Sequence, residues 1–154
     1  MQPYHNPALD ELATRLFREF ARLEYALKAA GFHNGDGRAE PNWRNFAMSI
    51  EGTFANLRSK STRQAIDYIL AHPPKKQVVR DGVLDWEDAQ PATDSHADLI
   101  LLYVRRVRNN LFHGGKFNGR WFDPERSVEL LRYSIEVLDA CLAASDAVKD
   151  AYDH

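Results

Sequence analysis

Apolar residues recur at three- and four-residue steps along most of this chain, which is the spacing of helices that bury one face. The pattern predicts a long helix over residues 8–30, with Gly31 as its C-cap, and a second helix over 43–57. A third, shorter helix is predicted from a cap at Ser61 or Thr62 to Leu70, because Pro73-Pro74 ends it. The buried stripes of the first two helices are expected to be Leu9, Leu12, Leu16, Phe20, Leu23 and Leu27, and Phe46, Ile50, Phe54 and Leu57.

Two further helices are predicted in the C-terminal half of the chain. One begins at a cap formed by Thr93, Asp94 or Ser95 and runs to about Phe112. The other begins near Pro124, since proline is frequent in the first turn of a helix. Their buried stripes are expected to be Ile100, Val104, Val107 and Leu111, and Val128, Leu131, Ile135, Leu138 and Leu142.

Residues 75–92 are the least regular part of the chain. Asp81-Gly82 separates two short apolar stretches, which is typical of a tight β-hairpin turn. The sequence therefore predicts a single all-α domain over residues 1–154. Its most economical form is an up-and-down bundle of four or five helices, with a short irregular or hairpin insertion around 75–92.

Composition is ordinary for a soluble globular domain, with 44% hydrophobic and 27% charged residues among 154. No run of about 18 apolar residues is long enough to span a membrane. The first residues lack the basic and apolar regions of a secretory signal. Cys141 is the only cysteine and falls in an apolar helical pattern, so we expect a buried thiol. These features favour a cytoplasmic protein without membrane partners.

The net charge of −2 gives no general case for binding nucleic acid, but the charges are unevenly placed. Residues 104–120 hold five basic residues and no Asp or Glu: Arg105, Arg106, Arg108, Lys116 and Arg120. Such a patch suits a small anionic site. The alternative is a solvated basic helix face, which is the commoner origin of a charge run.

Arg108 and His113 are the residues in this stretch best suited to catalysis. Arg stays charged at any pH, whereas His exchanges a proton near neutrality. Arg108 is expected on the flank of the buried stripe, with its stem along apolar surface. On an unbroken helix His113 would lie about 140° around from Arg108, so the two would not share a face. Either the Gly114-Gly115 break or a second subunit must bring them together.

Arg108-Asn109-x3-His113 resembles the Arg-x4–6-His motif of HEPN domains, which are all-α bundles, often homodimeric, and in many cases metal-independent ribonucleases. The first helix, from Phe20 to Lys28, and the place of the motif on the next-to-last helix also resemble this family. The resemblance implies an endoribonuclease of toxin or defence type that needs no metal or cofactor.

The resemblance also implies roles for individual residues. His113 would act as general base or acid on the RNA 2′-hydroxyl, and Arg108 would stabilise charge on the phosphorane. Asn109 would orient His113 or hold a phosphate oxygen, while Lys116 and Arg105 would bind RNA phosphates. A two-fold dimer would supply two histidines to one cleft, so we expect a homodimer.

One departure from the family bears on partners. Some HEPN toxins carry a tyrosine two residues after the histidine, which a partner nucleotidyltransferase modifies. Position 115 here is Gly, so the sequence does not support an antitoxin or nucleotidyltransferase of that kind. Two other functions remain open: a non-catalytic module that binds RNA or a nucleotide through the same basic groove, and a helical interaction protein without a ligand.

The remaining candidates favour structural roles. No two of His33, His72, His96 and His154 have the spacing of zinc ligands on a helix, so no metal site is predicted. Glu24 either lines the cleft or is a solvated helix residue, and the second is the commoner case. Trp43 and Trp86 are expected to anchor irregular segments against the core rather than to stack on bases.

Overall fold

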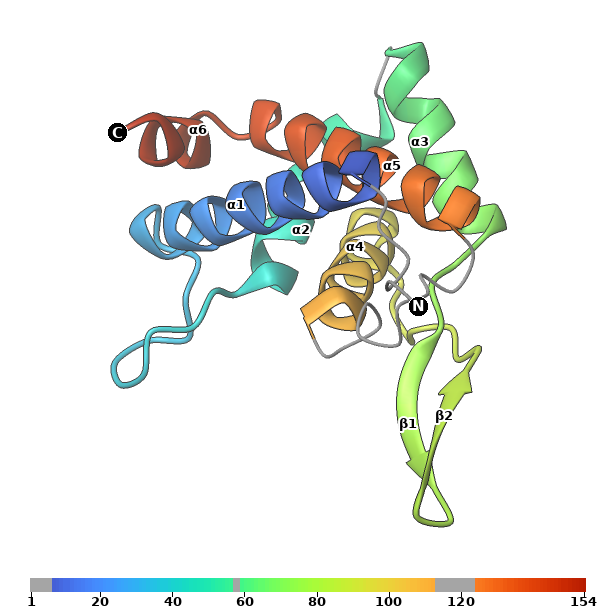
Figure 1. Ribbon diagram of the computed structural model, residues 1–154. Coiled ribbons are helices and arrows are strands. Elements are labelled where there is room, and N and C mark those ends of the chain that lie inside the picture. Colours follow the sequence, from blue (N-terminus) through green and yellow to red (C-terminus); the bar gives the residue numbers. More distant parts are fainter. Residues whose placement is uncertain (1–6, 57–58, 113–123) are drawn as a thin grey trace.

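A computed structural model describes residues 7–56, 59–112 and 124–154, and this part of the chain is mostly helical with one small two-stranded sheet (Figure 1). Its elements follow the order α1 (Pro7–Ala29), α2 (Trp43–Ala55), α3 (Lys60–Ala71), β1 (Lys76–Arg80), β2 (Val83–Glu87), α4 (His96–Phe112), α5 (Pro124–Ala143) and α6 (Asp146–Asp153). The all-α class predicted from the sequence is therefore confirmed at this level.

The first two helices form where the apolar spacing predicts them. Gly31, with a φ of +100°, follows α1 in the left-handed conformation that glycine adopts without strain. The predicted stripe of α1 is buried except for Leu12, which is partly buried. Phe46, Ile50 and Phe54 of α2 are buried as expected, and Leu57 lies outside the described residues.

The caps predicted for the third helix, Ser61 or Thr62, are wrong by two or three residues. Ser59, not Ser61 or Thr62, is the N-cap of α3, and its hydroxyl accepts a hydrogen bond from the Thr62 amide. The hydroxyls of Ser61 and Thr62 do not cap the helix and instead both donate to the Glu136 carboxylate of α5, at 2.9 and 3.2 Å. Contact with a neighbouring helix therefore decides which of three closely spaced hydroxyls caps α3.

Helix α4 begins and packs as predicted. Ser95 is the cap among the three candidates, since its hydroxyl accepts a hydrogen bond from the Asp98 amide at 3.0 Å. The expected stripe of Ile100, Val104, Val107 and Leu111 is buried. The opposite face of α4 is thereby left for other contacts.

The predicted hairpin is present and projects from the helical body (Figure 1). Strands β1 and β2 pair antiparallel, with Val79 opposite Leu84 and Arg80 opposite Val83. Asp81 and Gly82 form the two-residue turn with φ values of 52° and 77°, the conformation for which Asp-Gly is favoured. No residue of either strand belongs to the buried core, so the hairpin is held to the body only at its base.

The C-terminal region departs from the prediction of four or five helices, because the described residues form six. Helix α5 begins at Pro124 as expected but ends at Ala143, and Ser145 then caps a separate helix α6. The fully buried Val148 fixes α6 against the body, where it packs on α1 and α5. An eight-residue helix with one buried anchor is too short for a clear periodic signal.

The packing joins helices that are distant in sequence. The most extensive helix–helix contacts are α1 with α5, α3 with α5 and α2 with α4. One cluster of buried apolar side chains draws on all six helices and includes Cys141 and Trp43, which confirms the predicted buried thiol and the anchoring role of Trp43. The same role predicted for Trp86 is wrong, because this half-buried side chain lies on β2 and belongs neither to the cluster nor to the side chains packed against it. None of the described helices is both long and apolar enough to cross a bilayer.

Candidate functional site

Three arginines occupy the last two turns of α4, and each lies over an aromatic ring. Arg105 lies over Trp43, Arg106 over Tyr103 and Arg108 over both Phe20 and Phe112. None of the three forms an ion pair with a carboxylate among the described residues. Aromatic faces therefore hold these cations in place without cancelling their charge.

Arg108 lies on the flank of the buried stripe of α4, as predicted, and contacts Phe20 of α1. Its guanidinium carbon is 5.4 Å from the ring centre of Phe20 and 5.0 Å from that of Phe112. One guanidinium nitrogen, Nη1, donates to Oδ1 of Asn109 at 2.9 Å. A guanidinium has five N–H donors, and no other hydrogen bond joins Arg108 to the described residues. The half-buried Arg108 is thus held in one orientation with donors to spare.

Glu24 does not occupy the solvated position that the sequence favoured. The Trp43 indole Nε1 donates to the Glu24 carboxylate at 3.1 Å, and Glu24 is half-buried. Burial lowers the pKa of Arg105, against the opposing effect of the nearby Glu24 and Asp98 carboxylates. Arg105 nevertheless remains charged at physiological pH. One hydrogen bond and one cation–π contact, both made by Trp43, therefore link Glu24 of α1, α2 and Arg105 of α4.

The base of the hairpin is fastened to α4 by side chains that reach main-chain carbonyls. Nη1 of Arg106 donates to the carbonyls of Pro74 and Ala89, at 3.3 and 3.0 Å, on either side of the hairpin. The Asn110 side-chain amide donates to the carbonyl of Lys75 at 2.8 Å. These bonds satisfy carbonyls that no strand partner reaches and fix the start of β1 over the helix.

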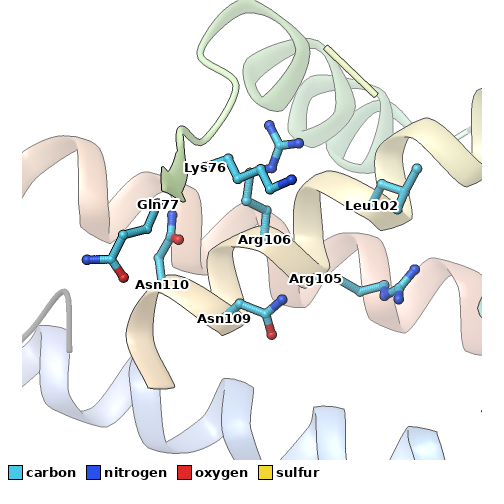
Figure 2. Close-up of a pocket in the computed structure, with 7 residues that line it drawn as sticks. All are labelled: Lys76, Gln77, Leu102, Arg105, Arg106, Asn109 and Asn110. Carbon is cyan, nitrogen blue, oxygen red and sulfur yellow. The ribbon is translucent and has the colours of Figure 1, made fainter. Parts of the chain in front are cut away.

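A pocket of about 450 Å³ lies between the start of β1 and the outward face of α4 (Figure 2). Its helical wall has the i, i+3, i+4, i+7, i+8 spacing of a single helix face. In Figure 2, Lys76 extends from β1 beside Arg106, and Gln77 extends from β1 on the other side, next to Asn110. The lining consists of Lys76, Gln77, Leu102, Arg105, Arg106, Asn109 and Asn110. Three cations and three amides thus face a hollow that no carboxylate lines.

The structure brings together three of the five residues predicted for the site. Arg105 and Asn109 line the pocket, and Asn109 also contacts Arg108. His113 and Lys116 lie outside the described residues. Sequence reasoning missed Lys76 and Gln77, although the Lys-Lys-Gln stretch at the predicted start of the hairpin offered a signal of basic character.

Within the described parts of the chain, no three His, Cys, Asp or Glu side chains gather as a metal site would require. Comparison of the chain with known protein families, curated proteins and solved structures finds no match.

Proposed function

We propose that this protein is an endoribonuclease with a HEPN-like helical bundle, which cleaves RNA without a metal ion at a site containing Arg108 and His113. The observation that carries the proposal is the fixed Arg108 guanidinium, held by Phe20, Phe112 and Asn109 in the last turn of α4. In sequence this turn is followed immediately by His113. A proton carrier and a permanent cation are the two groups that phosphodiester cleavage by RNA's own hydroxyl requires.

In the proposed reaction the 2′-oxygen attacks the adjacent phosphorus and the bond from phosphorus to the 5′-oxygen breaks. A histidine accepts the proton of the 2′-hydroxyl, and an acid returns a proton to the departing 5′-oxygen. The unused donors of Arg108 stabilise the negative charge that builds on the phosphorane. The products are a 2′,3′-cyclic phosphate and a 5′-hydroxyl.

The test is incubation of the purified protein with single-stranded RNA, with and without EDTA, followed by mapping of both new ends. We expect cleavage that persists in EDTA and leaves cyclic phosphate and 5′-hydroxyl ends. Arg108→Ala and His113→Ala should each lower the cleavage rate by about 100-fold or more. Matched controls are Arg80→Ala, an arginine paired with Asp85 and Glu87 on the hairpin, and His154→Ala, an exposed histidine.

Two results would contradict the proposal. One is cleavage that EDTA abolishes, and the other is full cleavage by both Arg108→Ala and His113→Ala. The cationic pocket favours a second candidate function, a module that binds RNA without cleaving it, since Lys and Arg supply most of the affinity for phosphates. RNA binding with no His113-dependent cleavage at any RNA would favour that module.

A further inference from the structure

The pocket between β1 and α4 has a composition that selects one class of ligand. Lys76, Arg105 and Arg106 are cations, and no acidic side chain lines the hollow itself, although the Glu24 and Asp98 carboxylates lie near Arg105. Gln77, Asn109 and Asn110 present amides, which both donate and accept hydrogen bonds. Cations bind phosphate oxygens, whereas amides pair with the edges of bases. One nucleotide unit of a nucleic-acid strand offers both kinds of partner.

The walls of the pocket are fixed before any ligand arrives. The Arg106 and Asn110 side chains tie α4 to the carbonyls of Pro74, Lys75 and Ala89 on both sides of the hairpin. The Lys76 and Gln77 side chains are therefore presented over the helix by a rigid base. A site built in this way loses less conformational entropy when it binds a strand.

Asn109 links the pocket to Arg108. Asn109 lines the pocket, and its Oδ1 accepts the hydrogen bond from Arg108 Nη1 at 2.9 Å. A strand whose phosphate meets Arg108 therefore has a neighbouring nucleotide within reach of the pocket. Unpaired bases are what proteins read by hydrogen bonds in RNA, since duplex RNA hides base edges in a narrow groove.

We infer that this pocket binds the nucleotide next to the cleaved phosphate of a single-stranded RNA, with Lys76 on a phosphate and Gln77 on a base edge. The inference rests on the proposed function for the position of the cleaved bond, but binding of the strand is tested separately. None of the residues predicted from the sequence to bind phosphates lies on the hairpin, so Lys76 and Gln77 are new assignments.

The binding test uses a fluorescein-labelled single-stranded RNA 12-mer of mixed sequence, titrated by fluorescence anisotropy in a His113→Ala background that prevents cleavage. We expect Lys76→Ala to weaken binding roughly fivefold or more and to lower the slope of log Kd against log salt by about 0.7. Gln77→Ala should alter the preference among RNAs of different base composition and leave the salt slope unchanged. Both side chains reach solvent, so neither change threatens the fold.

The matched control is Lys75→Ala, which removes the same charge from the neighbouring residue. Lys75 pairs with Asp88 at 3.9 Å and does not line the pocket. Equal effects of Lys75→Ala and Lys76→Ala, or no effect of Lys76→Ala, would overturn the inference. A single-stranded DNA 12-mer of the same sequence tests the choice of RNA. Equal affinity for this DNA, with the same dependence on Lys76, would overturn the assignment to RNA.

Cleavage rates of proteins that keep His113, with and without Lys76→Ala, separate this inference from the proposed function. With Lys76→Ala we expect a higher KM and a kcat within about twofold of the original, because the pocket binds the strand in both ground and transition states. Absence of His113-dependent cleavage, with the effect of Lys76→Ala on binding intact, would refute catalysis and leave the RNA pocket standing. Cleavage with an unchanged KM and unchanged affinity would refute the pocket alone.

Discussion

A pair of carboxyl groups between α1 and α5 makes Asp139 sensitive to pH. Burial, followed by the charge of Glu19, raises the pKa of Asp139 to about 6. The buried Oε2 of Glu19 has no hydrogen-bond partner among the described residues, and a protonated Asp139 would supply one. Because the pKa of Asp139 is raised in the folded protein, the stabilisation by its protonated form is complete below the unfolded pKa of Asp139, near 4. This stabilisation is lost as pH rises through 6.

Asp139→Asn should therefore stabilise the protein at neutral pH, since an amide donates to Glu19 at every pH. We expect a gain of a few tenths of a kcal/mol and below about 1 kcal/mol at pH 7.5, because the Asp139 side chain is 53% exposed and water screens the pair. The gain should disappear at about pH 3.5, below the unfolded pKa of Asp139. Urea unfolding at both pH values measures it, with the exposed Asp150→Asn as control. A loss of stability at pH 7.5 would contradict the assignment.

At the scale of elements, the start of α4 depends on Glu51 of α2. The Glu51 carboxylate accepts hydrogen bonds from the His96 and Ala97 amides, both at 2.9 Å, and from the Ser95 hydroxyl at 2.6 Å. Partial burial acts to raise the pKa of Glu51, but these three hydrogen bonds outweigh it, and the net pKa is lowered. The contact therefore joins α2 to α4 and caps α4 together with Ser95.

Glu51→Ala should lower the free energy of unfolding by about 1–3 kcal/mol at pH 7, because it leaves amides at a helix start without an acceptor. Part of this difference should vanish as pH falls from the unfolded pKa of about 4.3 through the lowered folded pKa, because protonation of Glu51 removes the charge that the amides stabilise. Chemical denaturation across this pH range tests it. Glu11→Ala, on the exposed face of α1, should stay within about 0.5 kcal/mol of the original protein. A similar small effect of Glu51→Ala would refute the capping role.

Elements with a strong local signal could be predicted from the sequence. Apolar spacing located α1, α2 and α4, and Asp81-Gly82 located the hairpin turn, because each depends on residues close in the chain. Features that depend on tertiary packing could not be predicted in this way. The choice of Ser59 as the cap of α3 and the separate helix α6 follow from contacts with α5 and α1.

The same distinction applies to the candidate site. Asn109 was predicted from its place directly after Arg108 in the motif, and Arg105 from the basic run of residues 104–120; both lie on one face of α4. Lys76 and Gln77 join them only because Arg106 and Asn110 fasten the hairpin over that face, which no spacing along the chain reveals. Glu24 was misjudged for a related reason, since its partner Trp43 lies 19 residues away on another helix.

At the scale of the whole molecule, the proposed chemistry favours a homodimer. RNA cleavage of this kind uses one base and one acid, and a two-fold axis would place two copies of His113 in one groove. The Phe112 side chain, 60% exposed beside Arg108, offers such a dimer an apolar contact at the site.

We expect light scattering after size-exclusion chromatography to give about twice the chain mass of 17.6 kDa. Mixing Arg108→Ala with His113→Ala should give partial cleavage that neither variant shows alone, because the shared groove then holds one intact Arg and one intact His in place of two of each. A fully active species of the single-chain mass would contradict the dimer.

The buried thiol of Cys141 has a practical consequence for such measurements. It is fully enclosed and burial raises its pKa, so it does not supply the thiolate that alkylating reagents attack. Since it is the only cysteine in the chain, a new cysteine on the surface would be the single point of labelling. A spin label at the exposed Val83, near the hairpin tip, would then report distances between subunits without any prior change to the core.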